Sequence, residues 1–159
     1  MNALNFATRV WTRFVTALES LQPLAQLAAR LYVAQVFFMS GLTKIQSWRV
    51  TVALFTDEYH VPLLPPEVAA ARGTAGELSL PVLLVLGLGG RFAALGLFVV
   101  NAVAVISYPA LEEAAIQQHV FWGSLLVGLA LWGPGRWSLD RVLWPRLQVA
   151  PAAGYTRAA

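Results

Sequence analysis

The chain has 159 residues, of which 58% are hydrophobic and only 12% are charged. A soluble domain carries about 25% charged residues, so this composition excludes an ordinary water-exposed surface. The net charge of +3 comes without the clustered basic face that nucleic-acid binding needs. The lack of cysteine excludes disulfides and thiolate metal sites within this chain. The composition therefore indicates an integral membrane protein with one small domain.

The N-terminal segment, residues 1–22, has the pattern of an amphipathic helix that lies in the membrane interface. Arg9 and Arg13 fall on the face opposite to its apolar residues, which suits contact with lipid headgroups. Pro23 stands where a proline is tolerated, at the first position of a new helix, so we expect the interfacial helix to end before it. The apolar positions recur at steps of three and four, at Leu4, Ala7, Trp11, Phe14, Leu18 and Leu21.

The central element is a helix predicted over residues 24–48, which is long enough to cross a bilayer. It carries Arg30 near one end and Lys44 near the other, and Gln35 is the one strongly polar side chain between them. At ~1.5 Å per residue the two charges are about 21 Å apart and lie roughly on one stripe. Because a stripe that faces lipid does not carry two cations, we expect other helices to face them.

The longest connection is predicted over residues 49–74. It begins with a short surface helix, continues as an extended stretch that contains three prolines, and ends with a short helix over PPEVAAARG that stops at Gly73. Thr74 and Glu77 then have the spacing of a capping box. We therefore expect the second membrane helix to begin after Thr74 and to run from Ala75 to about Leu88.

Two charge-free runs predict the third and fourth membrane helices. They extend from Phe92 to about Tyr108 and from about Ala115 to Trp132. Ser138 can cap a short amphipathic helix after them, and we expect residues 149–159 to form a disordered tail. The predicted fold is an all-α integral membrane four-helix bundle over residues 23–148, preceded by the interfacial helix.

The basic residues predict the orientation of this bundle. Four spans place both termini and the turn at residues 89–91 on one side of the membrane. By the positive-inside rule that side is cytoplasmic, because the opposite side holds fewer basic residues and five acidic ones. The basic residues on the cytoplasmic side are Arg9, Arg13, Arg91, Arg136, Arg141, Arg146 and Arg157, and those on the opposite side are Lys44, Arg49 and Arg72.

Several polar side chains fall at membrane depth in this arrangement. Lys44, Glu77 and His119 share one level near the outer face, Tyr108 can join them, and Asn101 lies near mid-depth. Intramembrane ionisable groups usually pair and face inward, so we expect Lys44 to pair with Glu77 and His119 to tune the pair or relay a proton. Alternatively, Glu77 is only a capping-box acid, Lys44 snorkels to the headgroups, and His119 is an ordinary helix-start residue.

Arg30 lies near the inner face, where we expect it to form a structural ion pair with Asp140. His60 and His119 are the only histidines and have no metal-type spacing, so no metal site is predicted. The sequence contains no nucleophile motif, phosphate loop or dinucleotide fingerprint. Catalytic residues therefore remain unassigned.

Six segments in order resemble the DoxX family of small membrane proteins. RLYVAQVFFMSGLTK resembles the opening helix of that family. LFTDEYHVPLLPPEVAA and GTAGELSLPVLLVLGLGGRFAALGLF are similar to its loop, the acidic start of its second helix and its second-to-third turn. SYPAL, HVFWGSLL and GPGRWSLD complete the pattern. The resemblance covers Ala29 to about Arg141.

The resemblance implies a four-helix protein of the bacterial inner membrane. Members are associated with redox systems, including thiosulfate:quinone oxidoreductase subunits, oxidative and thiol-stress membrane complexes, and operons of copper-linked, ribosomally made peptides. No agreed catalytic set can be carried over. Arg30, Lys44, Glu77 and Asp140 match recurring family positions.

We therefore expect a non-catalytic subunit or accessory factor of a redox or metal- and stress-handling membrane system. No cofactor is assigned, and quinone is the candidate that the resemblance suggests. The alternatives are a quinone-dependent oxidoreductase subunit, in which Glu77 or His119 moves a proton, and a small transporter or membrane scaffold. The expected partners are the bilayer, membrane or periplasmic proteins and a second copy of the chain, but not nucleic acid.

Overall fold

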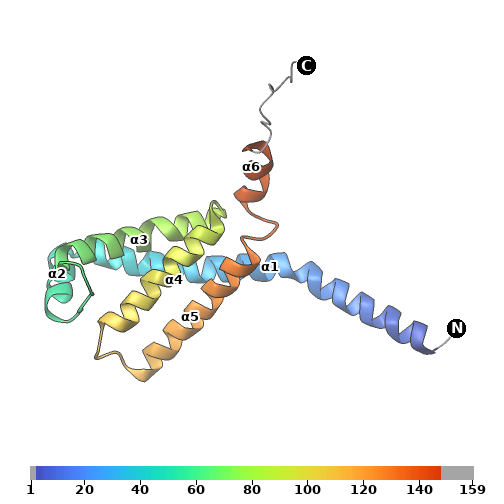
Figure 1. The fold of residues 1–159 in the computed structure, drawn as a ribbon, viewed down its shortest axis with the longest axis horizontal. Coiled ribbons are helices and arrows are strands. Elements are labelled where there is room, and N and C mark those ends of the chain that lie inside the picture. Colours follow the sequence, from blue (N-terminus) through green and yellow to red (C-terminus); the bar gives the residue numbers. More distant parts are fainter. Residues whose placement is uncertain (1–2, 148–159) are drawn as a thin grey trace, which may run out of the picture.

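The computed structural model describes residues 3–147, which form six helices and no strand within that range (Figure 1). This part of the chain is therefore all-α, as the composition predicted. The predicted tail, residues 149–159, lies outside the described residues. The helices are α1 (Ala3–Gln46), α2 (Trp48–Asp57), α3 (Pro66–Leu86), α4 (Gly90–Ser107), α5 (Glu113–Trp132) and α6 (Leu139–Leu147).

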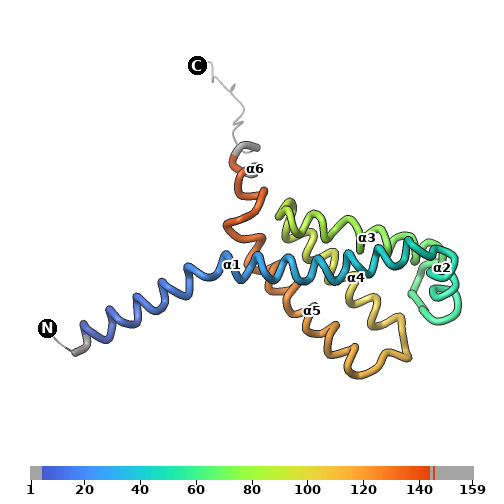
Figure 2. The backbone as a smooth tube through the Cα atoms, turned by 180° about the vertical axis from the view of Figure 1, so that it is seen from behind, coloured from blue at the N-terminus to red at the C-terminus, as the bar shows by residue number. Residues whose placement is uncertain are grey.

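Helix α1 is continuous over 44 residues, so the predicted break at Pro23 is wrong. A proline inside a helix removes one hydrogen bond and bends the helix, but need not end it. Figures 1 and 2 show this change of direction between the N-terminal half, which projects away from the other helices, and the C-terminal half, which packs with them. The loop before α6 approaches α1 here so closely that Gly135 leaves no room for a Cβ beside Gln26.

Helix α3 is also continuous, so the predicted break at Gly73 and the capping box at Thr74 are wrong. Glycine in a helix interior costs only ~1 kcal/mol relative to alanine, and α3 packs against α1, α2 and α4. Pro66 is at the helix start, as predicted, and Gly87 ends the helix with a φ of 65°. Glu77 therefore lies in the middle of a helix and is not an N-terminal capping residue.

The charge-free runs were located correctly, because the bounds of α4 and α5 agree with the predicted ones to within two residues. The short helix after them is present as α6. The hydroxyl of Ser138 donates a hydrogen bond to the Gly135 carbonyl 2.9 Å away, within the loop that leads into α6.

The buried core lies between the C-terminal half of α1 and helices α3, α4 and α5. Helix α1 packs against α3 and α5, and α4 packs against the same two helices. Alanines on α4 allow close approach between the helices. The core consists of Val33, Phe37, Leu84, Ala93, Ala94, Leu97, Leu126 and Leu129.

Three helices of the described region, α3, α4 and α5, are long and apolar enough to cross a membrane. Helix α1 is not among them, because its apolar stretch is interrupted by Arg30, Gln35 and Lys44. The outward surface of the three helices is rich in exposed apolar side chains, such as Val99 and Leu131. Such a surface suits contact with lipid.

Candidate functional site

An ion pair between Lys44 and Glu77 joins α1 to α3. The Lys44 Nζ lies 2.5 Å from both carboxylate oxygens of Glu77. It also donates to Ser40 Oγ, one turn earlier on α1, over 3.1 Å. The Lys44 side chain is 21% exposed and that of Glu77 is 9% exposed. Among residues 3–147 this is the one salt bridge, and it lies inside the helix packing.

Gly41 explains why the two helices come together at this level. A Cβ at Gly41 would lie 2.9 Å from the Leu78 side chain and 3.1 Å from the Cβ of Glu77. A larger residue would therefore push α3 away from α1. Close approach over a small residue is a common way for membrane helices to pack, and here it brings a four-carbon lysine side chain within reach of a glutamate.

A mostly apolar cavity of about 210 Å³ borders the ion pair between α2, α3 and α4. Its apolar walls include Phe55, Val61 and Val103, and its polar groups include Lys44, Glu77, Arg72, Tyr59 and Ser107. Ser107 is 1% exposed, and its hydroxyl has no hydrogen-bond partner among the residues that the structure describes. A buried hydroxyl without a partner is costly, and this one belongs to a residue in the wall of the cavity.

Tyr59 lines this cavity and was not predicted from the sequence. Its ring centroid lies 4.9 Å from that of Phe55 and 5.1 Å from that of Tyr108. Burial raises the pKa of the Tyr59 phenol, and the nearby phenol of Tyr108 and the carboxylates of Glu58 and Glu77 raise it further. Tyr59 therefore stays a neutral hydrogen-bond donor. The backbone N–H of His60, which donates to the Ser107 carbonyl over 2.8 Å, holds this segment on α4.

Tyr108, which the sequence placed at the same level, reaches the cavity only through its contact with Tyr59. The sequence signal for Tyr59 was weak, because an aromatic residue in a polar, proline-containing connection has many roles. Its spacing of four from Phe55 is the only pattern that points to the observed contact. No sequence pattern pointed to the unpaired hydroxyl of Ser107, since serine is common at the ends of helices.

His119 and Asn101 form a separate polar cluster between α4 and α5. His119 Nδ1 lies 2.8 Å from the amide oxygen of Asn101, and the Asn101 amide donates to the His119 carbonyl over 2.9 Å. The His119 ring also packs against Trp122 at a centroid distance of 5.0 Å. Neither His119 nor Asn101 lines the cavity beside Lys44 and Glu77. The structure thus divides the predicted outer polar level into two clusters.

Arg30, at the other end of the packed part of α1, is 1% exposed. Its guanidinium donates to the carbonyls of Leu84 at 2.8 Å, of Pro134 and Trp137 at 2.7 Å each, and to that of Val85. Leu84 and Val85 belong to the last turn of α3, and Pro134 and Trp137 belong to the loop before α6. The Leu84 carbonyl also accepts from the backbone N–H of Gly87, which caps α3, over 3.1 Å. Arg30 therefore joins three separate parts of the chain through backbone oxygens.

The predicted ion pair of Arg30 with Asp140 is not formed. The Asp140 carboxylate instead accepts hydrogen bonds from the backbone N–H groups of Gly89 and Gly90 at 2.8 and 2.9 Å. The unpaired N–H groups at the start of α4 favour an anion, as the carbonyls at the end of α3 favour a cation. Arg30 is therefore bound by the C-terminal end of α3 and Asp140 by the N-terminal end of α4, and the two side chains do not pair with each other.

No group of three or more histidine, aspartate or glutamate side chains that could hold a metal ion occurs within residues 3–147. The strongest chemical feature of this region is therefore the buried ion pair beside an apolar cavity. Such a site can bind a small, mostly apolar molecule and orient its polar atoms.

The family model described as DoxX matches residues 25–110, which is more than half of the chain. The matched segment contains Lys44, Glu77, Tyr59 and Ser107, and it ends before α5. No curated protein and no solved structure matches this sequence significantly.

Proposed function

The chain belongs to the DoxX family, and on that premise we propose that it is a non-catalytic accessory subunit of a redox or stress-handling system in the bacterial inner membrane. In this proposal its ligand is a quinone-like molecule held in the cavity beside Lys44 and Glu77. The observation that carries the proposal is the location of a partly buried ion pair on the wall of a mostly apolar cavity.

A fourth membrane span, formed by the C-terminal half of α1, is part of this proposal. That half contributes Val33 and Phe37 to the core and packs along α3 and α5. Its charged groups, Arg30 and Lys44, are hydrogen-bonded to other helices and loops and do not face lipid. Pairing of this kind lowers the cost of ionisable groups at membrane depth.

The orientation in the membrane follows from four spans. Both termini are then cytoplasmic, because most arginines lie on their side. The N-terminal half of α1 leaves the packed helices as an amphipathic segment, and its residues Phe6, Trp11 and Phe14 are more than half exposed. We place this segment in the cytoplasmic membrane interface, where its aromatic residues contact acyl chains and its arginines contact headgroups.

The cavity suits a ring that carries carbonyl or hydroxyl oxygens. Phe55, Val61 and Val103 line the cavity with apolar side chains, while Tyr59 lines it with a phenol that serves as the hydrogen-bond donor in this proposal. Pockets for small molecules commonly combine apolar walls with a few such polar groups. The cavity faces α2 and α4 at the predicted outer end, where an apolar ligand can enter from the bilayer.

An accessory role is favoured over catalysis by the state of the ion pair. Both carboxylate oxygens of Glu77 accept from Lys44, and the side chain is 9% exposed. A general acid or base must reach the proton that it transfers. His119, the other predicted proton carrier, is bound to Asn101 in a separate cluster.

The test is to purify the protein in mild detergent and to identify bound quinone and co-purifying proteins by mass spectrometry. Ala104 lines the cavity, so we expect Ala104→Phe to fill it and to lower bound quinone about tenfold, as the loss of ~1.4 kcal/mol of binding free energy would. The matched control is Ile106→Phe, since Ile106 is on the same helix and is 66% exposed. If both variants lose the same amount of bound quinone, the proposal is contradicted. It is also contradicted if the wild-type protein is monomeric and free of ligand.

A second measurement separates the accessory role from catalysis. Glu77→Gln keeps the shape of the side chain but removes its charge and its basicity. If this variant still assembles with its partners and binds quinone, yet the activity of the complex is lost, then the chain takes part in the chemistry and the accessory role is wrong. Unchanged activity per assembled complex supports the accessory role.

A further inference from the structure

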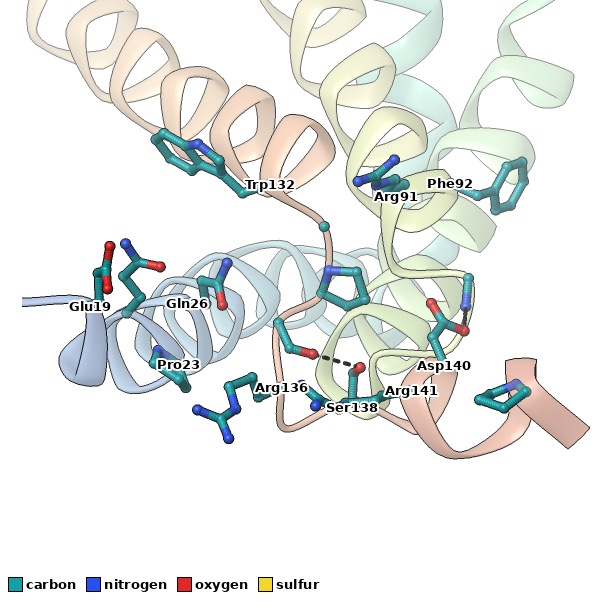
Figure 3. Close-up of a pocket in the computed structure, with 16 residues that line it drawn as sticks. Glu19, Pro23, Gln26, Arg91, Phe92, Trp132, Arg136, Ser138, Asp140 and Arg141 are labelled. Carbon is teal, nitrogen blue, oxygen red and sulfur yellow. Dashed lines mark hydrogen bonds between the residues drawn. The ribbon is translucent and has the colours of Figure 1, made fainter. Parts of the chain in front are cut away.

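A second and larger cavity, of about 1010 Å³, lies at the end of the packed helices opposite to the Lys44–Glu77 pair. Figure 3 shows its walls: α1 with Glu19, Pro23 and Gln26 on one side, the start of α4 with Arg91 on the other, and the loop that leads into α6 between them. We call this cavity the arginine groove, because Arg91, Arg136 and Arg141 line it. It shares no residue with the site proposed above.

The guanidinium groups of the arginine groove are available to a ligand. Arg136 and Arg141 are exposed and have neither an ion-pair partner nor a hydrogen-bond partner within the described part of the chain. Arg91 makes one long contact, from its guanidinium to the Leu131 carbonyl at 3.4 Å. A guanidinium with free N–H donors is the side chain best suited to bind phosphate oxygens in pairs.

The carboxylates of the groove compensate only part of this positive charge. Asp140 already accepts from the backbone N–H groups of Gly89 and Gly90. Glu19 lines the groove from α1. Three arginines therefore face two carboxylates, one of which is engaged by a helix terminus, and an anion is the complementary ligand.

Exposed aromatic residues locate the arginine groove at the level of the lipid headgroups. Trp132 is 76% exposed, Phe92 is 69% exposed and Trp137, in the adjoining loop, is 57% exposed. Tryptophan and other aromatic side chains gather where the membrane meets water. Apolar residues of α4 and α5 continue from the groove along the lipid-facing surface, including Leu95 and Leu131, which are 55% and 70% exposed.

We propose that the arginine groove binds the phosphate of an anionic phospholipid, with the arginines donating to phosphate oxygens and the acyl chains lying along α4 and α5. The charge of the groove selects an anion, and the adjoining apolar surface selects one that carries acyl chains. Basic pockets on the cytoplasmic side of membrane helices are suited to such headgroups. The positive-inside orientation proposed above places the groove on that side.

The experiment compares lipids bound to the full chain. Protein purified from bilayers that contain equal amounts of phosphatidylglycerol and phosphatidylcholine is analysed by native mass spectrometry, and the ratio of the two bound lipids is measured. We expect phosphatidylglycerol to be enriched, and the enrichment to fall about 30-fold in the variant Arg136→Gln/Arg141→Gln, because two charge-assisted contacts from guanidinium groups to the phosphate are lost. Circular dichroism checks that the variant is folded, which we expect because both side chains are exposed.

The matched control is Arg9→Gln/Arg13→Gln, which removes two charges on the same side of the membrane but away from the groove. We expect the control to change the ratio less than about threefold, because the site-specific contacts remain. If phosphatidylglycerol enrichment falls equally in both variants, the arginines act only through general attraction to an anionic surface, and the proposal is overturned. A second measurement compares the unfolding temperature with added inorganic phosphate and with added phosphatidylglycerol. If both raise it equally, the groove binds a free anion, and the lipid proposal is also overturned.

Discussion

Lys44 on α1 and Glu77 on α3 are 33 residues apart in sequence, and the lysine Nζ lies 2.5 Å from the carboxylate. Two helices therefore meet at a pair of opposite charges inside a mostly apolar protein. Removing two charges from water is costly, and their attraction offsets this cost only while both partners are present. The energetic consequence can be tested directly.

Lys44→Met and Glu77→Gln should each lower the free energy of unfolding by about 3 kcal/mol or more, because each leaves the other charge buried and unpaired. The double variant should lose less than the sum of the two, by about 1–3 kcal/mol. Reversible unfolding in mixed detergent micelles measures all four proteins. Additive losses would mean that the two side chains do not interact energetically.

Arg30→Lys should destabilise the protein by about 3 kcal/mol, although it keeps the charge. The guanidinium of Arg30 serves carbonyls of α3 and of the loop before α6, and the compact ammonium of lysine cannot reach them all. The carbonyls that lose the guanidinium as donor account for the loss, although that of Leu84 keeps the Gly87 N–H. The control is Arg49→Lys on an exposed residue of α2, which should change the free energy of unfolding by less than about 0.5 kcal/mol. If the two variants have the same free energy of unfolding, the positive charge at residue 30 is sufficient for stability and the hydrogen bonds of the guanidinium are not needed.

Gly41→Ala and Gly73→Ala should have opposite effects on stability. A Cβ at Gly41 would lie 2.9 Å from Leu78, so alanine there should destabilise by about 1–3 kcal/mol through overpacking. The nearest atom to a Cβ at Gly73 is 3.8 Å away, on the Phe55 ring. Alanine at this position inside α3 should therefore stabilise by up to about 1 kcal/mol through its better helix propensity. Thermal unfolding compares them, and a stabilising Gly41→Ala would contradict the close contact between α1 and α3.

Tyr59 should remain protonated at a pH where an ordinary tyrosine ionises. Its pKa is raised above 10.0, first by burial and then by the nearby groups Tyr108, Glu58 and Glu77. Its contribution to stability is fully present below pH 10 and is lost as the pH rises through the raised pKa of the folded state. Between pH 10 and this raised pKa the unfolded chain is favoured, because its tyrosine has the ordinary pKa and ionises first.

In Tyr59→Phe the free energy of unfolding should therefore fall less steeply above pH 10 than in the wild type. The folded wild type should also show, in its ultraviolet absorbance, a phenolate transition at high pH that the variant lacks. A phenolate transition of Tyr59 at or below the ordinary pKa would show that the cavity beside Lys44 and Glu77 admits water freely.

The apolar runs in the sequence were sufficient to locate α4 and α5 to within two residues. A charge-free apolar run of about 18 residues or more crosses a membrane as a helix, which satisfies its own backbone hydrogen bonds, so composition and length determine these spans. The membership of the DoxX family was also predicted from short segments in order, and the family match confirms it.

The local signals for helix ends were misleading at Pro23 and Thr74. A proline or a capping pattern changes the free energy of a helix by only ~1–3 kcal/mol, and packing against other elements is stronger. At Pro23 the loop before α6 covers the helix, and at Thr74 three other helices surround α3. The continuity of α1 and α3 is a result of these tertiary contacts.

Position along a helix can be read from the sequence, and this explains why the contact between Lys44 and Glu77 could be predicted. The direction in which a side chain points depends on the rotation of each helix about its axis, which only packing sets, so His119 was placed with the wrong neighbours. The partners of Arg30 are backbone carbonyls, which every residue possesses and which therefore leave no pattern in the sequence. Composition and periodicity thus specify the charge-free helices α4 and α5, whereas the contacts between helices specify where α1 and α3 end and which polar groups meet.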